Sequence, residues 1–224
     1  MPRLPRVDVG DEIYHVINRA NARLPIFFEE EDFELFEYIL EEAQEKFRMR
    51  ILAYCLMPNH FHLVLHSHED GDLQKFMQWL TLTHTQRWHI KNETTGTGHL
   101  YQGRYKSFII QGDKHLFSVI RYVERNPLRA KLVKKVENWN FSSLARRLSN
   151  NPKKQKLLAL LPIEMPDDYL AFVNTPMNKE EEDTIRYSVN RSKPFGSNRW
   201  TDEMIEKFQL KATVRKRGRQ IKGT

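Results

Sequence analysis

The chain of 224 residues is long enough for one ordinary domain, or for one domain with an extension. Hydrophobic residues make up 40% and aromatic residues 11%, which suffices for a packed core and argues against wholesale disorder. No apolar run approaches the ~20 residues of a transmembrane helix, and the N-terminal segment lacks an apolar signal region, so we expect a cytoplasmic protein. The single cysteine, Cys55, excludes a disulfide framework.

Charge is distributed unevenly along the chain, although the formal net charge is only +7. Residues 29–45 carry nine acidic residues and no Lys or Arg, whereas residues 71–135 carry twelve basic residues against four acids. Residues 191–224 carry ten basic and three acidic residues, which accounts for the whole excess. This pattern is typical of a protein with one face turned to a polyanion, and equally of a solvated surface with a basic tail.

The first half of the chain is predicted to begin with a strand, a helix and a hairpin. Residues 12–19 are β-rich, and residues 31–47 have apolar side chains at helical spacing. Residues 50–57 and 60–66 are two apolar segments separated by the turn signal Pro58-Asn59, which indicates two antiparallel strands.

The pattern then predicts a helix over residues 72–91, a strand over 105–111 and a helix that Asp113 caps. That helix should stop near Asn126, because the residue before Pro127 avoids helical geometry. The resulting order β-α-β-β-α-β-α predicts the α+β class, as a ferredoxin-like or split-βαβ antiparallel sheet with helices on one face.

The organisation expected is a domain of residues 1–150 followed by a C-terminal extension of residues 151–224. Residues 179–190 and 201–210 could each form a short helix. Residues 211–224 carry six basic residues and no acid, so we expect this segment to be extended and mobile until it meets phosphate.

A histidine pair lies on the predicted third strand. His60 and His62 point to the same face because side chains alternate along a strand, while Phe61 points to the other face and should pack under the helices. Two imidazoles on one rigid strand could seat a metal, with further ligands from elsewhere in the chain. Two surface histidines on a half-exposed strand would give the same pattern, and His66 shares their face.

The predicted third helix carries a second set of chemically active residues. Tyr122 and Asn126 are four residues apart and therefore share a helical face. The Asn126 amide oxygen suits a hard metal, and the Tyr122 phenol could attack phosphorus, although a phenol is a weak nucleophile unless activated. A tyrosine on an ordinary amphipathic helix with an asparagine near its end remains the structural alternative.

These two motifs together resemble the single-tyrosine HUH transposases of bacterial insertion sequences, and most closely the REP-associated tyrosine transposases. The first is Leu56-Met57-Pro58-Asn59-His60-Phe61-His62-Leu63, and the second runs from Arg121-Tyr122 to Arg129-Ala130. The segments Gly98–Ser107, Ser192–Ser197 and Arg215–Arg219 are also similar to the family. The likeness spans residues 11–145 well and the tail moderately. It departs from many insertion-sequence relatives in having Asn126 where they have Gln.

The resemblance implies a site-specific single-strand DNA endonuclease and strand transferase that acts on a REP-like hairpin through a 5′-phosphotyrosine intermediate. It implies Tyr122 as the nucleophile and His60, His62 and Asn126 as ligands of a divalent metal, Mg²⁺ or Mn²⁺. It further implies a monomer or homodimer that is nucleoid-associated and has no membrane partner. The residues expected to contact DNA are Arg104, Lys106, Arg121, Arg125, Arg129, Arg215, Lys216, Arg217 and Arg219.

Two other functions remain open on sequence alone. The first is a DNA-binding protein of the same fold without catalysis. The second is a ferredoxin-like RNA-binding module, which would carry aromatic residues where this sheet face has histidines. Tyr101 and Tyr105 are rival nucleophiles, but we interpret them as core or DNA-stacking residues.

Overall fold

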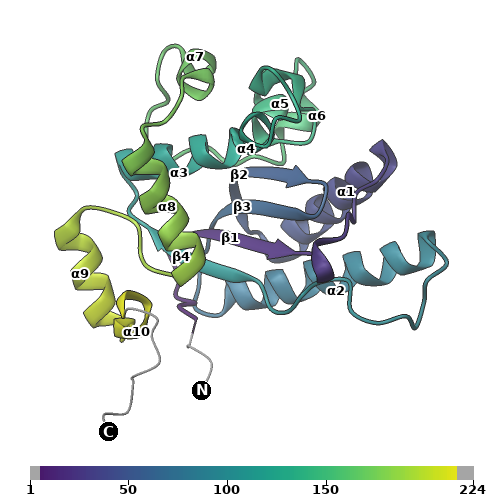
Figure 1. The fold of residues 1–224 in the computed structure, drawn as a ribbon, viewed down its shortest axis with the longest axis horizontal. Helices are drawn as coiled ribbons and strands as arrows, with labels where there is room; N and C mark the ends of the chain where they lie inside the picture. The colour runs from purple at the N-terminus through teal and green to yellow at the C-terminus, as the bar shows by residue number, and fades with distance from the viewer. Residues whose placement is uncertain (1–5, 216–224) are drawn as a thin grey trace, which may run out of the picture.

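The structure, a computed structural model, describes residues 6–215 as an antiparallel sheet with helices around it (Figure 1). Among these residues no helix is both long and apolar enough to cross a membrane. The elements in chain order are β1 Ile13–Arg19, η1 Asn21–Arg23, α1 Glu30–Phe47, β2 Arg50–Met57, β3 His60–His66, α2 Asp72–Lys91, β4 Lys106–Ile110, α3 Lys114–Glu124, α4 Asn126–Arg129, η2 Val136–Asn138, α5 Ser143–Leu148, α6 Pro152–Gln155, α7 Tyr169–Asn174, α8 Lys179–Arg191, α9 Asn198–Lys207 and α10 Lys211–Val214.

The four strands lie in the order β2-β3-β1-β4, which Figure 1 shows side by side. All three pairs are antiparallel, and β3 and β1 occupy the centre. This arrangement confirms the predicted ferredoxin-like α+β sheet and places the histidine motif on a central strand. A central strand is paired on both sides, so its side chains are held by two neighbours.

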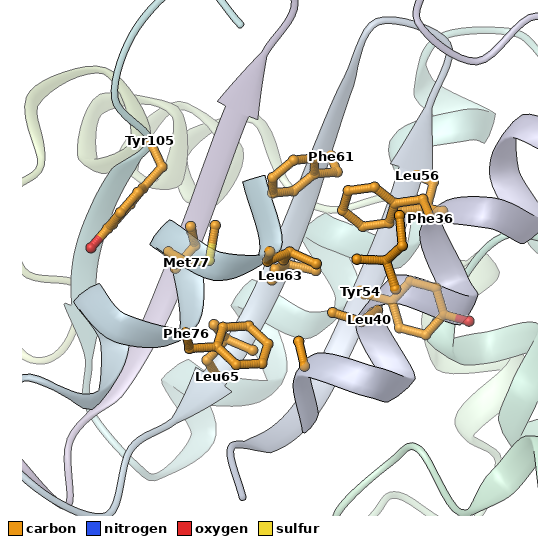
Figure 2. Packing of buried hydrophobic residues seen from close by; sticks show 14 of the residues in the cluster. Phe36, Leu40, Tyr54, Leu56, Phe61, Leu63, Leu65, Phe76, Met77 and Tyr105 are labelled. Atoms are coloured by element: carbon orange, nitrogen blue, oxygen red, sulfur yellow. The ribbon is translucent and has the colours of Figure 1, made fainter. Parts of the chain in front are cut away.

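One face of the sheet packs against α1 and α2. Phe61 and Leu63 of β3 contact Phe36 of α1 and Phe76 of α2 in one buried cluster, which Figure 2 shows from close by. Alternation along β3 therefore buries Phe61 under the two helices, as predicted, and turns His60 and His62 to the opposite face.

The opposite face is covered by α3, so the expectation of helices on one face only is wrong. Leu116, Val119 and Val123 of α3 form a second buried cluster with Val64 of β3 and Phe108 of β4. The physical reason is visible in β2, where seven of the eight residues are buried, because a strand that is apolar on both faces needs cover on both.

Helices α7 and α8, from the chain after residue 150, pack back onto this second face, whereas Trp200 and Met204 of α9 pack against the first cluster. Val173 of α7 and Ile185 of α8 belong to the same buried cluster as α3, and Phe195 pairs with the outer edge of β4. The division at residue 150 stays a prediction. Residues 211–214 form the short helix α10 rather than an extended segment, because Thr213 is buried and Arg191 donates to the carbonyls of Ala212 and Thr213.

Candidate active site

The histidine pair lies at the end of β3, where β3 pairs with β1. The register places His60 opposite Arg19 and His62 opposite Ile17. The two imidazole centroids are 5.1 Å apart, with the rings at a steep angle to each other. The prediction that both histidines share one sheet face is therefore confirmed, and the two rings form one cluster.

Each histidine uses its Nδ1 atom for a hydrogen bond inside the protein. The Nδ1 atom of His60 lies 2.7 Å from Oδ1 of Asn59, and the Nδ1 atom of His62 lies 2.8 Å from Nε2 of His15. Within residues 6–215 neither Nε2 atom has a hydrogen-bond partner, and neither is fully buried. Both Nε2 atoms are therefore left without a protein partner among the described residues.

Burial keeps both rings uncharged. Desolvation, with the positive charges of Arg19 and Arg129 beside it, lowers the pKa of His60 to about 3. Desolvation also lowers the pKa of His62 well below its usual range. The imidazoles are therefore neutral at neutral pH, which is the form that binds a metal ion.

Tyr122 lies on the face of α3 that covers the histidines. Its ring centroid is 6.1 Å from that of His62, in an edge-to-face arrangement, and the residue is 4% exposed. Its hydroxyl makes no hydrogen bond to any described residue. The sequence placed Tyr122 and the histidine pair on separate elements, and the structure brings them together.

Arg129 completes the cluster from the turn of helix after Tyr122. Its guanidinium carbon lies 4.3 Å from the centroid of the Tyr122 ring, and one of its amino groups donates to Oδ1 of Asn126. The helix α3 ends at Glu124, near the predicted stop, but Asn126 does not avoid helical geometry: it begins α4, in whose first turn Pro127 is tolerated. The Asn126 amide nitrogen donates to the Tyr122 carbonyl at 3.1 Å, so the four-residue spacing is kept across the break.

The residues of this cluster fit a divalent cation in part. The two open imidazole nitrogens match the borderline ions and Mn²⁺, and no group of three or more His, Cys, Asp or Glu side chains within residues 6–215 forms a more complete cage. Further ligands would have to be oxygens, from an amide, water or phosphate. The Asn126 oxygen faces the Arg129 guanidinium instead, so its role as a third ligand stays a prediction.

The rival tyrosines lie elsewhere. Tyr101 is buried under α2 on the other side of the sheet, where its hydroxyl bonds to Nδ1 of His84 at 2.6 Å. Burial raises the pKa of Tyr101 well above its usual range, which makes it a poor nucleophile. Tyr105 carries the Arg6 guanidinium over its ring, 4.0 Å from the centroid. The interpretation of Tyr101 as a core residue is confirmed.

Three of the arginines expected to contact DNA have protein partners. Arg129 pairs with Glu182 at 3.3 Å in addition to its bond to Asn126. Arg121 donates to the carbonyls of Thr175 and Pro176 at 2.6 and 2.9 Å, and Arg125 donates to that of Val173 at 2.7 Å. The last carbonyls of a helix have no partner within the helix, and these bonds supply one at the C-terminal end of α7. They give Arg121 and Arg125 a structural role in holding α7 against α3.

Arg104 and Lys106 instead border a cavity of about 290 Å³ beside the outer edge of β4. Arg6, Ser192 and Thr213 of α10 also line it, so residues from distant parts of the sequence meet at this cavity. Ser107, which is 8% exposed, adds a hydroxyl with no hydrogen bond to the described residues. The cavity combines three cations with hydroxyl groups, a composition that suits phosphate.

Arg215 is exposed at the end of α10, and its carbonyl accepts a hydrogen bond from Arg191. The predicted DNA contacts Lys216, Arg217 and Arg219 lie outside the described residues.

Sequence reasoning missed His15 and Arg6. The face that His66 shares with the pair also suggests that His66 could support the two ligands, but it lies at the far end of β3, where it bonds to Asp11 at 3.1 Å. His15 is fully buried beside His62. Alternation along the strand could have identified it. Tyr14 and Val16 point into the core under α1 and α2, so His15 between them must point to the opposite face, where the histidine pair lies.

The antiparallel α+β sheet brings a strand-borne histidine pair against a helix-borne tyrosine, which is the arrangement that the resemblance to tyrosine transposases implies. The chain belongs to the family described as "Transposase IS200 like", whose profile matches residues 8–126. The matched range includes both histidines, Tyr122 and Asn126. The protein is therefore a transposase of this family.

The chain is also similar to a curated relative and to a solved structure. The chain is 23% identical over 119 residues to a REP-associated tyrosine transposase of Haemophilus influenzae, covering 50% of this chain and 68% of the relative. It also superposes on the structure of a REP-associated tyrosine transposase bound to a REP hairpin, with a TM-score of 0.57 and 15% identity over 80% of this chain and 100% of the other. The second likeness shows the fold. The resemblance inferred from the motifs is confirmed in family and fold.

Proposed function

We propose that this transposase is a metal-dependent, site-specific endonuclease and strand transferase for single-stranded DNA that carries a REP-like hairpin. The observation that supports the proposal most is the position of Tyr122. Its hydroxyl is free of hydrogen bonds to the described residues, and its ring lies beside His62, whose Nε2 is open together with that of His60.

The reaction would begin with attack of the Tyr122 oxygen on a DNA phosphorus. The bond from phosphorus to the 3′-oxygen breaks, the phenolic proton goes to solvent, and the departing oxygen takes up a proton to become a 3′-OH. The DNA 5′-phosphate is then linked to Tyr122. This phosphotyrosine bond conserves the energy of the broken linkage, so a second 3′-OH can reverse the step and join strands without ATP.

The chain's own residues would supply the electrostatics of this step. Arg129, which lies over the Tyr122 ring, would hold the attacked phosphate and offset its charge. His60 and His62 would hold Mg²⁺ or Mn²⁺ through their Nε2 atoms, with Asn126 as a third ligand if it exchanges its bond to Arg129. When bound, the ion would polarise a non-bridging phosphate oxygen and lower the barrier to attack.

The DNA would extend from this site to the basic cavity beside β4. Arg6, Arg104 and Lys106 would bind backbone phosphates there, and the tail that follows Arg215 starts from α10, whose Thr213 lines the same cavity. The hairpin is proposed because the similar solved structure is described as bound to a REP hairpin.

A nicking assay tests the proposal. Labelled oligonucleotides that carry the palindromic repeats flanking the gene, each with single-stranded ends, are incubated with the protein and Mn²⁺ or Mg²⁺. We expect a covalent protein–DNA adduct and a shortened strand with a free 3′-OH, both absent with EDTA and with RNA of the same sequence. Binding of the hairpin without cleavage under any metal would instead indicate the non-catalytic DNA-binding protein.

Removal of residues 216–224 should weaken DNA binding mainly at low salt. The segment carries four cations, Lys216, Arg217, Arg219 and Lys222. If all four met phosphates of single strands, its loss would flatten the slope of log K against log[salt] by ~3, from ~0.7 per contact, and partial engagement gives about 1–3. Cleavage of saturating substrate should persist.

Hairpin binding measured across a salt series checks this expectation. The truncation ends after Arg215, so it leaves α10 and its contacts with Arg191 in place. Arg199→Gln is the control, because Arg199 is an exposed cation that pairs with Glu203 on α9. An unchanged slope in the truncated protein would show that the tail does not touch DNA.

A further inference from the structure

The hydrogen bond between His15 and His62 sets the state of the candidate metal ligand. Nε2 of His15 lies 2.8 Å from Nδ1 of His62, and the His15 ring is also in contact with Phe108, with centroids 4.8 Å apart. His15 is fully buried on the central strand β1, so its ring is enclosed by protein. A hydrogen bond between two neutral imidazoles contains one proton, which belongs to one ring or the other.

Only one of these two arrangements allows His62 to bind a metal. A neutral imidazole has a single N–H group, so an Nε2 atom that binds a cation requires the proton on Nδ1. His62 must then donate to His15, and Nε2 of His15 must accept. If His15 donated instead, the proton of His62 would sit on Nε2 and block the ligand atom.

His60 offers an internal comparison, because its partner leaves no such choice. The Asn59 amide nitrogen donates to the carbonyl of Arg23 at 2.9 Å, which turns the amide oxygen toward Nδ1 of His60. That oxygen can only accept, so His60 carries its proton on Nδ1 and has a bare Nε2. The partner of His62 can donate or accept, so it supports the metal-binding tautomer only when Nε2 of His15 is the acceptor.

We propose that His15 is a positioning residue that holds His62 in the tautomer whose Nε2 can bind a divalent cation. The proposal rests on the metal site of the proposed function. It carries a structural consequence, since Nδ1 of His15 is buried without a partner among the described residues. In the metal-binding arrangement this atom is an unpaired N–H. The two arrangements of the His15–His62 pair carry the same number of protons, so they have the same net charge.

Two substitutions at residue 15 test the proposal through metal affinity. His15→Phe keeps a ring against Phe108 but removes the acceptor, and the dissociation constant for Mn²⁺ should rise about 10–100-fold, as for other outer partners of metal-binding histidines. His15→Gln offers an amide oxygen that can accept from His62, and it should restore most of the affinity. Calorimetry with Mn²⁺ alone measures both, and thermal unfolding shows that each variant is folded.

His84→Phe is the matched control. His84 is also fully buried and also has one unpartnered ring nitrogen, but it lies on α2 on the other side of the sheet. We expect its Mn²⁺ affinity to equal that of the unchanged protein, even if the variant is less stable. Equal Mn²⁺ affinity of folded His15→Phe and the unchanged protein would overturn the role of His15.

Nitrogen NMR of the unsubstituted protein gives a readout that does not depend on whether a variant folds. In protein loaded with diamagnetic Mg²⁺ or Zn²⁺, we expect His15, His60 and His62 all to carry their protons on Nδ1. A proton on Nε2 of His15 in the loaded protein would overturn the inference. If His60→Ala and His62→Ala do not weaken Mn²⁺ binding, the metal site itself is wrong; if they do and His15→Phe does not, only the inference about His15 fails.

Discussion

Tyr122→Phe is expected to abolish nicking and the covalent DNA adduct while leaving hairpin affinity nearly unchanged. The substitution removes only the hydroxyl, which has no hydrogen bond to the described residues, so its loss leaves no partner unsatisfied. The ring keeps its contacts with His62 and with the Arg129 guanidinium. Removal of the nucleophile from an enzyme that works through a covalent intermediate should lower the rate on the order of 10⁴-fold or more.

The measurement is an SDS-resistant adduct between the protein and labelled single-stranded DNA, together with hairpin binding at fixed salt. Tyr101→Phe is the matched control, because Tyr101 is the rival that sequence left open and lies under α2, bonded to His84. That variant should lose stability through the unpaired His84 nitrogen and still form the adduct. An adduct that persists in Tyr122→Phe would move the nucleophile to another tyrosine.

His60→Ala and His62→Ala are each expected to eliminate metal-dependent cleavage and to weaken Mn²⁺ binding by roughly 100-fold or more, beyond the ~10–100-fold typical of outer partners. Each variant removes one of two open imidazole nitrogens on the same strand face. A site with one imidazole and only water and phosphate oxygens binds a borderline ion much more weakly than a site with two imidazoles. Hairpin affinity should change little, because the proposed phosphate contacts lie mainly beside β4 and in the tail.

His66→Ala is the control for these two variants. His66 belongs to the same strand and the same face, yet it bonds to Asp11 at the opposite end of β3. Its substitution should leave both the Mn²⁺ dissociation constant and the nicking rate unchanged. Full activity of His60→Ala or His62→Ala in limiting metal would remove the metal site from the proposal.

The sequence by itself determined the main strands and helices up to α3, and which residues share a face within each of them. Alternation along β3 places His60 and His62 on one face, and the strand and helix patterns up to α3 match the observed bounds within about two residues. The four-residue spacing of Tyr122 and Asn126 likewise survives the helix break at Pro127. These features are local, because strand and helix periods are properties of a few consecutive residues.

Which elements cover one another was decided only by the tertiary structure. Periodicity shows that α3 has an apolar face but not that this face closes over His62, and it gives no reason to pair His15 with a residue 47 positions away. Likewise, charge along the chain could not separate Arg125, which holds α7, from Arg104 beside the basic cavity. A side chain's partner depends on which distant segments the buried apolar surfaces bring together, and no local pattern records that.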